Sequence, residues 1–270
     1  MDSELLKSRF FTTNDKRMDT VVFPLPAPWW SRPYEYAWAA EFVKPTDVIL
    51  DAACGVCHPF KFHLADNCEI VHAIDKDERI LDMNKTADEV QKAFGEGAKL
   101  DYLEKLDWHE GINFKQASIT DLPYKDNMFD TVFCISVLEH LPDEDKAKAL
   151  KEFRRTLKNN GQVILTLDYP DTNIDLMESL ANKASLKLAS EKDAAIPNDA
   201  IRLNYLETKF LRCFRMVLVK DKDDEDPENK SVNTPEQKLE PEPKQEKGSS
   251  GKTGTKKSVE KKTKSKTNKA

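Results

Sequence analysis

Glycine is scarce in this chain, with 8 residues among 270. The apolar run at residues 48–50 ends in Asp51, and the turn after it holds one glycine, Gly55. Ala53 and Cys57 flank that glycine. A pyrophosphate needs close approach of the backbone at three points, which is why dinucleotide sites carry G-x-G-x-x-G. The shortage of glycine therefore argues against a dinucleotide site.

Cysteine is also infrequent, and the sequence lacks long apolar runs. The five cysteines are scattered. An odd number of thiols without an apolar secretory leader favours free cysteines in a reducing compartment, so we expect a cytoplasmic protein. No run approaches the length of a membrane span. The sequence therefore predicts no membrane span.

Residues 221–270 contain no aromatic residue and almost no aliphatic one. This stretch begins acidic and ends rich in lysine. Such a composition cannot bury enough apolar area to offset the entropy of ordering, so we expect a disordered tail. A solvated tail is favoured over one that tethers the protein to a polyanion or an anionic membrane. The body before it is acidic, which disfavours nucleic-acid binding except through the tail.

Two apolar runs that each end in an acid carry the main functional signal. Asp51 closes the first run, and Asp75 closes a second run at residues 71–74. The pattern is typical of buried parallel strands, and open α/β folds bind ligands at the carboxyl edge of such a sheet. The second acid is placed to bind two ribose hydroxyls. The pattern predicts a site for an adenosyl-type cofactor.

Residues 48–57 resemble the first motif of class I S-adenosylmethionine-dependent methyltransferases. Three later segments resemble further motifs of that family in the same order, most closely those of its small-molecule branch: residues 117–124, 127–141 and 157–166. Asp51 and Gly55 fit the first motif, whereas Ala53 and Cys57 stand where the family usually has glycine. The resemblance implies an α/β fold with a doubly wound, mostly parallel, seven-stranded sheet of the Rossmann-like methyltransferase type.

The resemblance also implies the cofactor, S-adenosyl-L-methionine, and the residues that hold it. Asp51 and Gly55 would surround the methionine moiety, with backbone contributions from Ala53 and Cys54. Asp75 would bind the ribose diol. Adenine recognition would fall to the Ser118 hydroxyl and the Ile119 backbone N–H, because serine stands where the family often has aspartate.

Alternating periodicities predict the elements of this domain, which we place at residues 46–220. Asp143 is predicted as the N-cap of one of the helices. Strands are expected near 47–51, 70–74, 112–116, 129–135, 162–168 and 211–219, with a weaker one near 186–190, and helices near 34–43, 57–66, 78–93, 143–158 and 173–184. The last strand would be the antiparallel strand of the family's sheet.

Residues 1–45 form an aromatic and proline-rich segment ahead of the first strand. In this family such segments commonly cover the substrate pocket, which makes Trp29, Trp30 and Tyr34 candidate substrate-binding residues. Tryptophan in this position also packs against the body of a domain. The sequence gives both roles equal weight.

Candidate catalytic residues follow the fourth and fifth predicted strands. Glu139 and His140 would lie near the cofactor methyl group, although a structural, hydrogen-bonded histidine is the favoured role for His140. Asp168 and Tyr169 face the same crevice and are weaker candidates for contact with the acceptor. A general base is needed only if the acceptor must lose a proton.

Residues 54–58 spell C-x-x-C-H, which also occurs in haem attachment sites. Haem attachment of that kind requires export, and no second pair of ligands has the spacing of a structural zinc site. A redox pair is a further alternative. Coincidence within a cofactor loop is favoured, and no metal is expected.

The sequence thus predicts an enzyme that transfers a methyl group from S-adenosylmethionine to a small molecule. Two alternatives stay open: a catalytically weak or silent methyltransferase-like binding protein, and a methyltransferase of protein or nucleic acid. The methylated atom, the role of the tail and the oligomeric state are not determined by the sequence.

Overall fold

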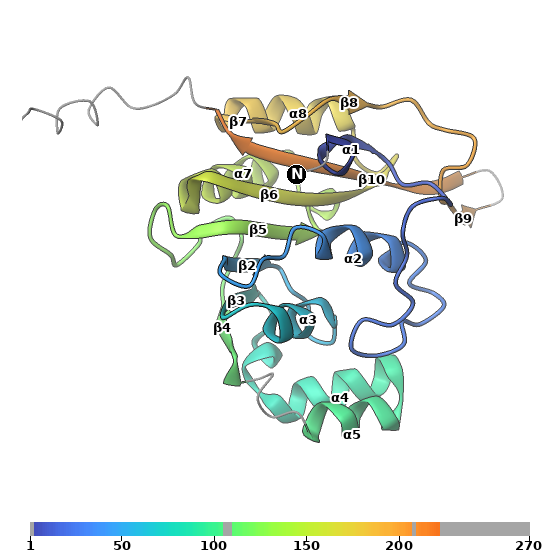
Figure 1. The fold of residues 1–270 in the computed structure, drawn as a ribbon, viewed down its shortest axis with the longest axis vertical. Helices are drawn as coiled ribbons and strands as arrows, with labels where there is room; N and C mark the ends of the chain where they lie inside the picture. The colour runs from blue at the N-terminus through green and yellow to red at the C-terminus, as the bar shows by residue number, and fades with distance from the viewer. Residues whose placement is uncertain (1–2, 105–109, 207–208, 222–270) are drawn as a thin grey trace, which may run out of the picture. The chain divides into compact units, whose positions relative to one another are not determined.

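The computed structural model describes residues 3–104, 110–206 and 209–221 (Figure 1). All of them belong to one compact unit, residues 1–225. Most of the predicted tail lies outside the described residues. Among the described residues, no helix is long and apolar enough to cross a membrane.

The central sheet contains every strand that the sequence predicts. Its first six strands follow the order β4-β3-β2-β5-β6-β10, which can be traced upward in Figure 1. Neighbours from β4 to β6 are parallel, and β10 runs antiparallel to β6. The fold class and the antiparallel last strand are therefore confirmed. The strands are β2 (Val48–Ala52), β3 (Ile70–Asp75), β4 (Ile112–Gln116), β5 (Phe129–Ile135), β6 (Leu157–Tyr169), β7 (Leu186–Leu188) and β10 (Lys209–Lys220).

The sheet of the described residues has ten strands rather than the expected seven. The additional strands are short: β1 (Ser8–Phe10), β8 (Lys192–Asp193) and β9 (Leu203–Leu206). β10 is long enough to pair with β7, β1 and β9 along one edge, and β8 extends the sheet from β1. These three strands have two to four residues, which is too short for a clear periodicity, and the sequence did not predict them.

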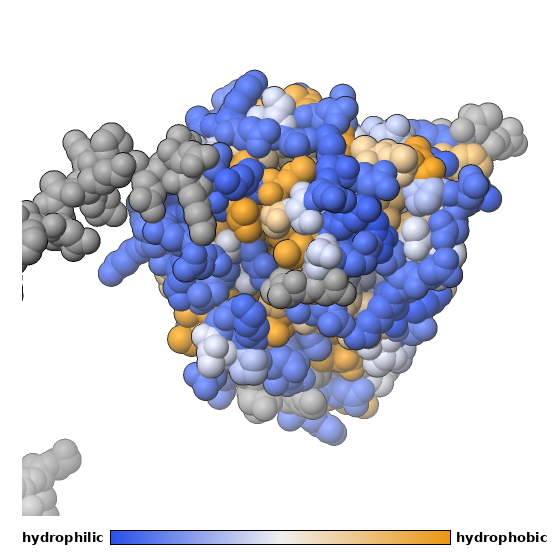
Figure 2. All heavy atoms as spheres, turned by 45° about the horizontal axis from the view of Figure 1, so that its top comes forward, coloured by the Kyte–Doolittle hydropathy of each residue, from blue (hydrophilic) through white to orange (hydrophobic). Residues whose placement is uncertain are grey.

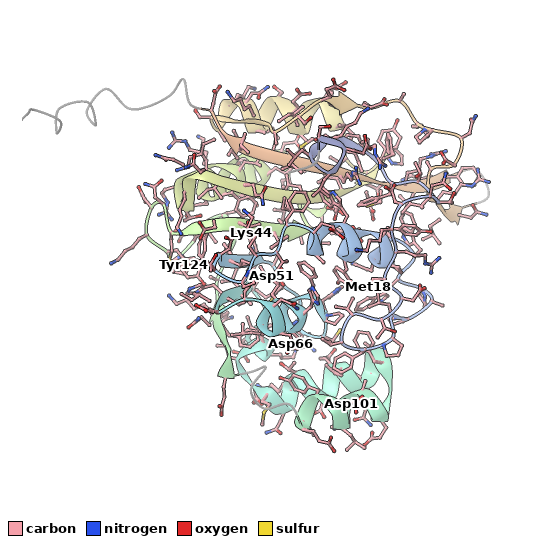
Figure 3. The ribbon with its side chains drawn as sticks, viewed as in Figure 1. Met18, Lys44, Asp51, Asp66, Asp101 and Tyr124 are labelled. Carbon is pink, nitrogen blue, oxygen red and sulfur yellow. The ribbon has the colours of Figure 1, made fainter. Side chains whose placement is uncertain are left out.

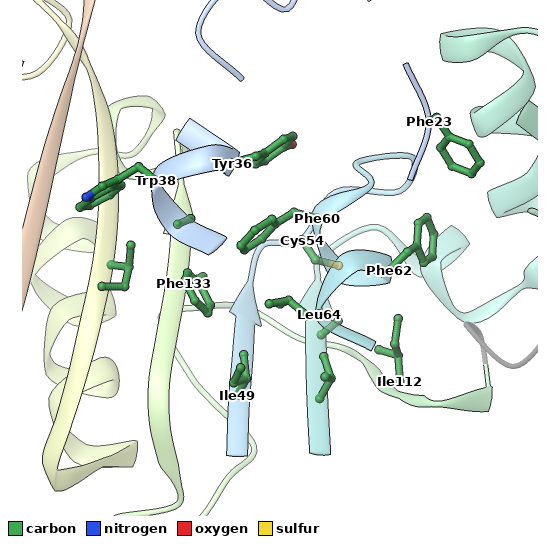
Figure 4. Packing of buried hydrophobic residues seen from close by; sticks show 14 of the residues in the cluster. Phe23, Tyr36, Trp38, Ile49, Cys54, Phe60, Phe62, Leu64, Ile112 and Phe133 are labelled. Carbon is green, nitrogen blue, oxygen red and sulfur yellow. The ribbon is translucent and has the colours of Figure 1, made fainter. Parts of the chain in front are cut away.

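Two layers of helices cover the two faces of the sheet. Alternate residues of each strand point to opposite faces, so Ile49 packs with α2 and α3 while Leu50 packs with α7 and α8. Figure 4 shows the first of these layers, where Tyr36 and Phe60 lie above the end of β2. The helices are α1 (Ser3–Leu6), α2 (Arg32–Ala40), α3 (Phe60–Asn67), α4 (Met83–Phe94), α5 (Glu96–Glu104), α7 (Asp143–Thr156) and α8 (Ile174–Lys183), with short 3-10 turns η1 (Glu78–Leu81) and η2 (Leu138–His140).

Four details of the helices differ from the prediction, the first being that α1 was not predicted. The helix expected at 78–93 is divided into η1 and α4, because the Asp82 carboxylate accepts hydrogen bonds from Asn84 N and Lys85 N and starts a new helix. Asp143 is the first residue of α7 rather than its N-cap, which is Pro142, and it pairs with Lys146. α5 was not predicted, because its sequence has almost no apolar periodicity.

The surface drawn in Figure 2 is mainly hydrophilic, with apolar residues scattered between charged ones. This pattern is ordinary for a folded domain, since apolar atoms contribute much of any protein surface. Several of the candidate site residues instead line cavities at the carboxyl ends of the parallel strands.

Candidate functional site

A cavity of about 80 Å³ lies at the carboxyl ends of β2 and β5. Asp51, at the end of β2, lies on its wall, and Figure 3 shows this residue near the centre of the sheet. The remaining lining residues come from α2, from the loop after β2 and from the end of β5: Arg32, Tyr36, Ala53, Cys54, Gly55, His58, Phe60, Ile135, Ser136 and Val137. Four predicted cofactor residues therefore line one cavity.

The loop after β2 has a strained and tightly held backbone. Ala53 and Gly55 both have φ of +62°. A side chain at such a φ costs about 1–2 kcal/mol, so Ala53 carries strain that glycine would not. Gly55 cannot be replaced without movement, because a Cβ there would lie 2.5 Å from Cδ2 of His58. At position 53, alanine therefore adopts the left-handed backbone conformation that glycine usually provides.

Lys61 fixes this loop through hydrogen bonds to its carbonyl groups. The sequence did not predict this role. The Lys61 side chain is 0% exposed, and its Nζ donates hydrogen bonds to the carbonyl oxygens of Gly55 and His58 at 2.7 Å each. A buried ammonium that meets carbonyl oxygens fixes their direction. The signal available in the sequence was a lysine between two apolar residues at the start of a helix.

Asp51 and Asp75 lie on either side of the loop. Asp75 Oδ2 accepts a hydrogen bond from Gly55 N, and Oδ1 accepts one from Asp77 N, both at 2.9 Å. Burial, opposed by Lys61 and reinforced by Asp75, raises the pKa of Asp51 to about 7. The contact of Asp75 with a ribose stays a prediction.

The loop after β4 carries the residues predicted for adenine. Ala117 N donates to Asp75 O at 2.9 Å, which places this loop beside the end of β3. The Ser118 hydroxyl is hydrogen-bonded to the Thr120 hydroxyl at 2.7 Å, and the Ile119 side chain is buried. Neither residue lines the 80 Å³ cavity.

Aromatic side chains close the outer side of the crevice. Trp29 stacks on the imidazole of His58, with ring centroids 4.4 Å apart. His58 Nδ1 is hydrogen-bonded to the Tyr36 hydroxyl at 2.8 Å, and Tyr36 stacks on Phe60. Burial, with the nearby cations Arg32 and Lys61, lowers the pKa of His58 to about 3. His58 is therefore neutral at physiological pH.

A second cavity of about 150 Å³ lies beside this aromatic group. It is lined by Pro28, Trp29, Trp30, Ser31, Arg32, His58 and Asp168. Trp29 and Trp30 thus line a cavity, as the pocket-cover hypothesis requires. Tyr34 is buried in the core with the Arg17 guanidinium over its ring, and it lines neither cavity.

The wall between the two cavities contains a buried ion pair that was not predicted. Glu35 is 0% exposed and pairs with Arg32. Glu35 Oε1 accepts hydrogen bonds from the hydroxyls of Ser136 and Thr166, both at 2.6 Å. Burial would raise the pKa of Glu35, but Arg32 and the two hydroxyls outweigh it and lower that pKa. Glu35 is therefore ionised.

Two further carboxyl groups lie near this pair. Glu139 is buried in η2, and its Oε1 accepts a hydrogen bond from Asp168 N at 3.3 Å. Burial, reinforced by Asp168 and Glu35, raises the pKa of Glu139 to about 8. Burial and Glu35 raise the pKa of Asp168 to about 6.

The other two candidates that follow these strands lie elsewhere. His140 is exposed at the end of η2 and lines neither of the two cavities. Tyr169 points to the opposite face of the sheet, where its ring meets Phe10. Their proposed contacts with substrate stay predictions.

The C-x-x-C-H segment shows no arrangement for metal binding. Cys54 is buried and Cys57 half-buried, and both are free thiols. His58 is engaged by Tyr36 and Trp29. Within the described ranges, no three His, Cys, Asp or Glu side chains are grouped closely enough to hold a metal ion.

Comparisons with known proteins agree with this geometry. A family model described as a methyltransferase domain matches residues 50–165. The ubiquinone/menaquinone biosynthesis C-methyltransferase UbiE of Haemophilus ducreyi is 34% identical over 106 residues, which cover 39% of this chain and 40% of that protein. An uncharacterised protein of Methanocaldococcus jannaschii is 50% identical over 58 residues, covering 22% of this chain and 24% of that one.

A solved structure supports the fold. The structure of the [4+2]-cyclase SpnF is 14% identical, with a TM-score of 0.53, and covers 78% of this chain and 86% of that one. The chain spans less than half the length of the curated relatives it matches. The family motifs, their order and the strand order coincide in one molecule, and the matched segment, residues 50–165, is a methyltransferase domain of the class I S-adenosylmethionine-dependent type.

Proposed function

We propose that this protein transfers a methyl group from S-adenosylmethionine to a small-molecule acceptor. The observation that carries the proposal is the cavity at the ends of β2 and β5, which is built from the first family motif and bordered by Asp75. S-adenosylmethionine supplies an electrophilic methyl group on a sulfonium. The protein's task is then to hold the acceptor in line with that group.

The residues present fit such a cofactor. Ala53 and Gly55 give the loop the backbone conformation that leaves room at the end of β2. Asp75 would bind the ribose hydroxyls, because a carboxylate with two oxygens accepts further hydrogen bonds beyond the two backbone N–H groups it already meets. Arg32, on the cavity wall, would donate to the carboxylate of the methionine moiety through guanidinium nitrogens other than Nη1, which meets Glu35 and Ser136.

The cofactor cavity, at about 80 Å³, is small compared with most ligand sites, which measure about 300–1,000 Å³. Trp29 and His58 lie over the loop and line the adjoining cavity. Movement of this stacked pair would join the two cavities and admit the cofactor. The pair would then return as a cover that keeps water away from the reacting groups.

The second cavity favours a small acceptor. Its lining includes two indoles, an imidazole, a guanidinium and a carboxylate, and its volume of about 150 Å³ suits a small molecule rather than a peptide or a nucleic-acid strand. UbiE, a partial relative, is named for methylation in quinone biosynthesis. That name supports a small-molecule acceptor in general and does not identify this one.

The test is transfer of labelled methyl groups from S-adenosylmethionine in a deproteinised, nucleic-acid-free extract. We expect label in the small-molecule fraction. Label that appears only when protein or nucleic acid is added back would contradict the proposal.

A matched pair of glycine variants controls for the site. Gly55→Ala should abolish transfer, because the new Cβ meets His58 at 2.5 Å and φ is positive. Gly97→Ala adds the same methyl group in α5 with nothing within 4 Å, and it should leave transfer unchanged.

A further inference from the structure

Asp168 presents an unsatisfied oxygen beside the second cavity. Its Oδ1 is buried and has no hydrogen-bond partner among the described residues, while the side chain lines the cavity. A buried carboxylate oxygen without a donor costs free energy, and native structures usually satisfy such atoms. Because Oδ1 itself is shielded, a donor on a bound molecule would reach it once the Asp168 side chain turns toward the cavity, and would then complete this site.

The other walls of the cavity select the kind of donor. Trp29 and Trp30 both line it, and the faces of indole rings attract cations. A carboxylate beside aromatic rings is a suitable environment for an ammonium group. A neutral hydroxyl or a carbon acid would bind there more weakly, because it carries no positive charge.

We infer that the methyl acceptor is a small amine, which Asp168 binds through its carboxylate in the cavity walled by Trp29 and Trp30. This inference rests on the proposed function. It assigns the acceptor class, and it makes Asp168 a catalytic residue that receives a proton.

The charges around Asp168 agree with a cationic ligand. The Arg32 guanidinium is also on the wall, but Glu35 neutralises it. His58 is neutral, and the raised pKa of Glu139 keeps that carboxyl group protonated near pH 7. Asp171, an exposed neighbour, is paired with Lys209 at 3.0 Å and contributes little to the charge of the cavity. The cavity thus has an excess of negative charge once Asp168 is ionised.

The chemical step balances with the groups present. The bound ammonium gives one proton to the Asp168 carboxylate and becomes a neutral amine. Its nitrogen lone pair forms the new N–C bond while the C–S bond breaks and its electron pair stays on sulfur. The product is a methylated ammonium, and Asp168 releases its proton to solvent. Glu139 acts as a positioning residue, because its Oε1 accepts the hydrogen bond of Asp168 N.

The test compares benzylamine with its neutral analogue, benzyl alcohol, by calorimetric titration of the S-adenosylhomocysteine complex of the full chain at pH 7.5. We expect the amine to bind roughly tenfold more tightly. Asp168→Asn should remove that preference and leave the affinity for S-adenosylhomocysteine within about twofold. Asp171→Asn is the control variant. It removes a charge at an exposed position, three residues after Asp168, and it should keep the preference.

Three results would overturn the inference. These are equal binding of the two probes, no binding of benzylamine, and a loss of S-adenosylhomocysteine affinity in Asp168→Asn, which would assign Asp168 to the cofactor. A wild-type protein that binds no S-adenosylhomocysteine would overturn the proposed function as well, so the two failures are distinguishable.

Discussion

Ser136 donates a hydrogen bond to Glu35 Oε1 at 2.6 Å, although the two residues are 101 positions apart in the chain. Ser136 follows β5 with a φ of +48°, and Glu35 lies in α2. Thr166 of β6 donates to the same oxygen. The contact joins the aromatic N-terminal segment to the ends of two central strands. α2 is therefore part of the crevice wall, whatever movement Trp29 makes.

Glu35→Ala should destabilise the protein strongly. The change leaves the Arg32 guanidinium buried without its counter-charge, which typically costs about 3–5 kcal/mol. Chemical denaturation would measure this as a lower free energy of unfolding. Glu41→Ala is a suitable control, because its ion pair with Lys16 is exposed and should contribute less than about 1 kcal/mol. Equal losses of unfolding free energy in the two variants would show that the buried ion pair contributes no more to stability than the exposed one.

Ala53→Gly should leave stability unchanged or raise it by up to about 1 kcal/mol. Glycine removes the cost of a positive φ, and the greater freedom of the unfolded chain offsets part of the gain. Ala52→Gly, one residue earlier in the buried strand, lacks that compensation and should lose about 1 kcal/mol. Thermal unfolding of both variants provides the comparison, and a similar loss at both positions would argue against strain at Ala53.

The sequence predicted the seven main strands because apolar runs and turn residues mark them locally. It also located the loop after β2 that lines the 80 Å³ cavity, since Asp51, Gly55 and Asp75 stand at or just after the ends of such runs. The Glu35–Ser136 contact could not be predicted, because it depends on the packing of α2 against two distant strands. Lys61 was missed for a similar reason: a lysine in an apolar helix gives no indication of which carbonyl oxygens it meets.

Lys61→Met should weaken S-adenosylhomocysteine binding by roughly tenfold. The substitution fills a similar volume but removes the donors that hold the carbonyl groups of Gly55 and His58, so the loop must be ordered at the time of binding. Calorimetric titration would measure the loss. Lys44→Met changes a residue outside the cavity lining and should bind as the wild type does. Unchanged affinity in Lys61→Met would mean that the loop keeps its conformation without the lysine.

Thermal stability of the ligand-free protein should fall as the pH rises from 6.5 to 8. Burial raises the folded-state pKa of Glu139 to about 8 and that of Asp51 to about 7. In the unfolded chain both groups are already ionised over this range, so only the folded state loses protons as the pH rises, at a cost of about 1–2 kcal/mol. Glu139→Gln should flatten the pH dependence, whereas an unchanged slope would contradict the buried, protonated state of Glu139.

The most direct test of the account is calorimetric titration of the full chain with S-adenosylhomocysteine. We predict binding of one molecule per chain, and a loss of affinity of roughly 10- to 100-fold in Asp75→Asn, because that variant keeps the size of the side chain and removes the charge that grips the ribose. Asp66→Asn, which removes a charge from an exposed position of α3 (Figure 3), should bind as the wild type does. No binding by the wild type, or equal binding by Asp75→Asn, would contradict the assignment of this crevice to S-adenosylmethionine.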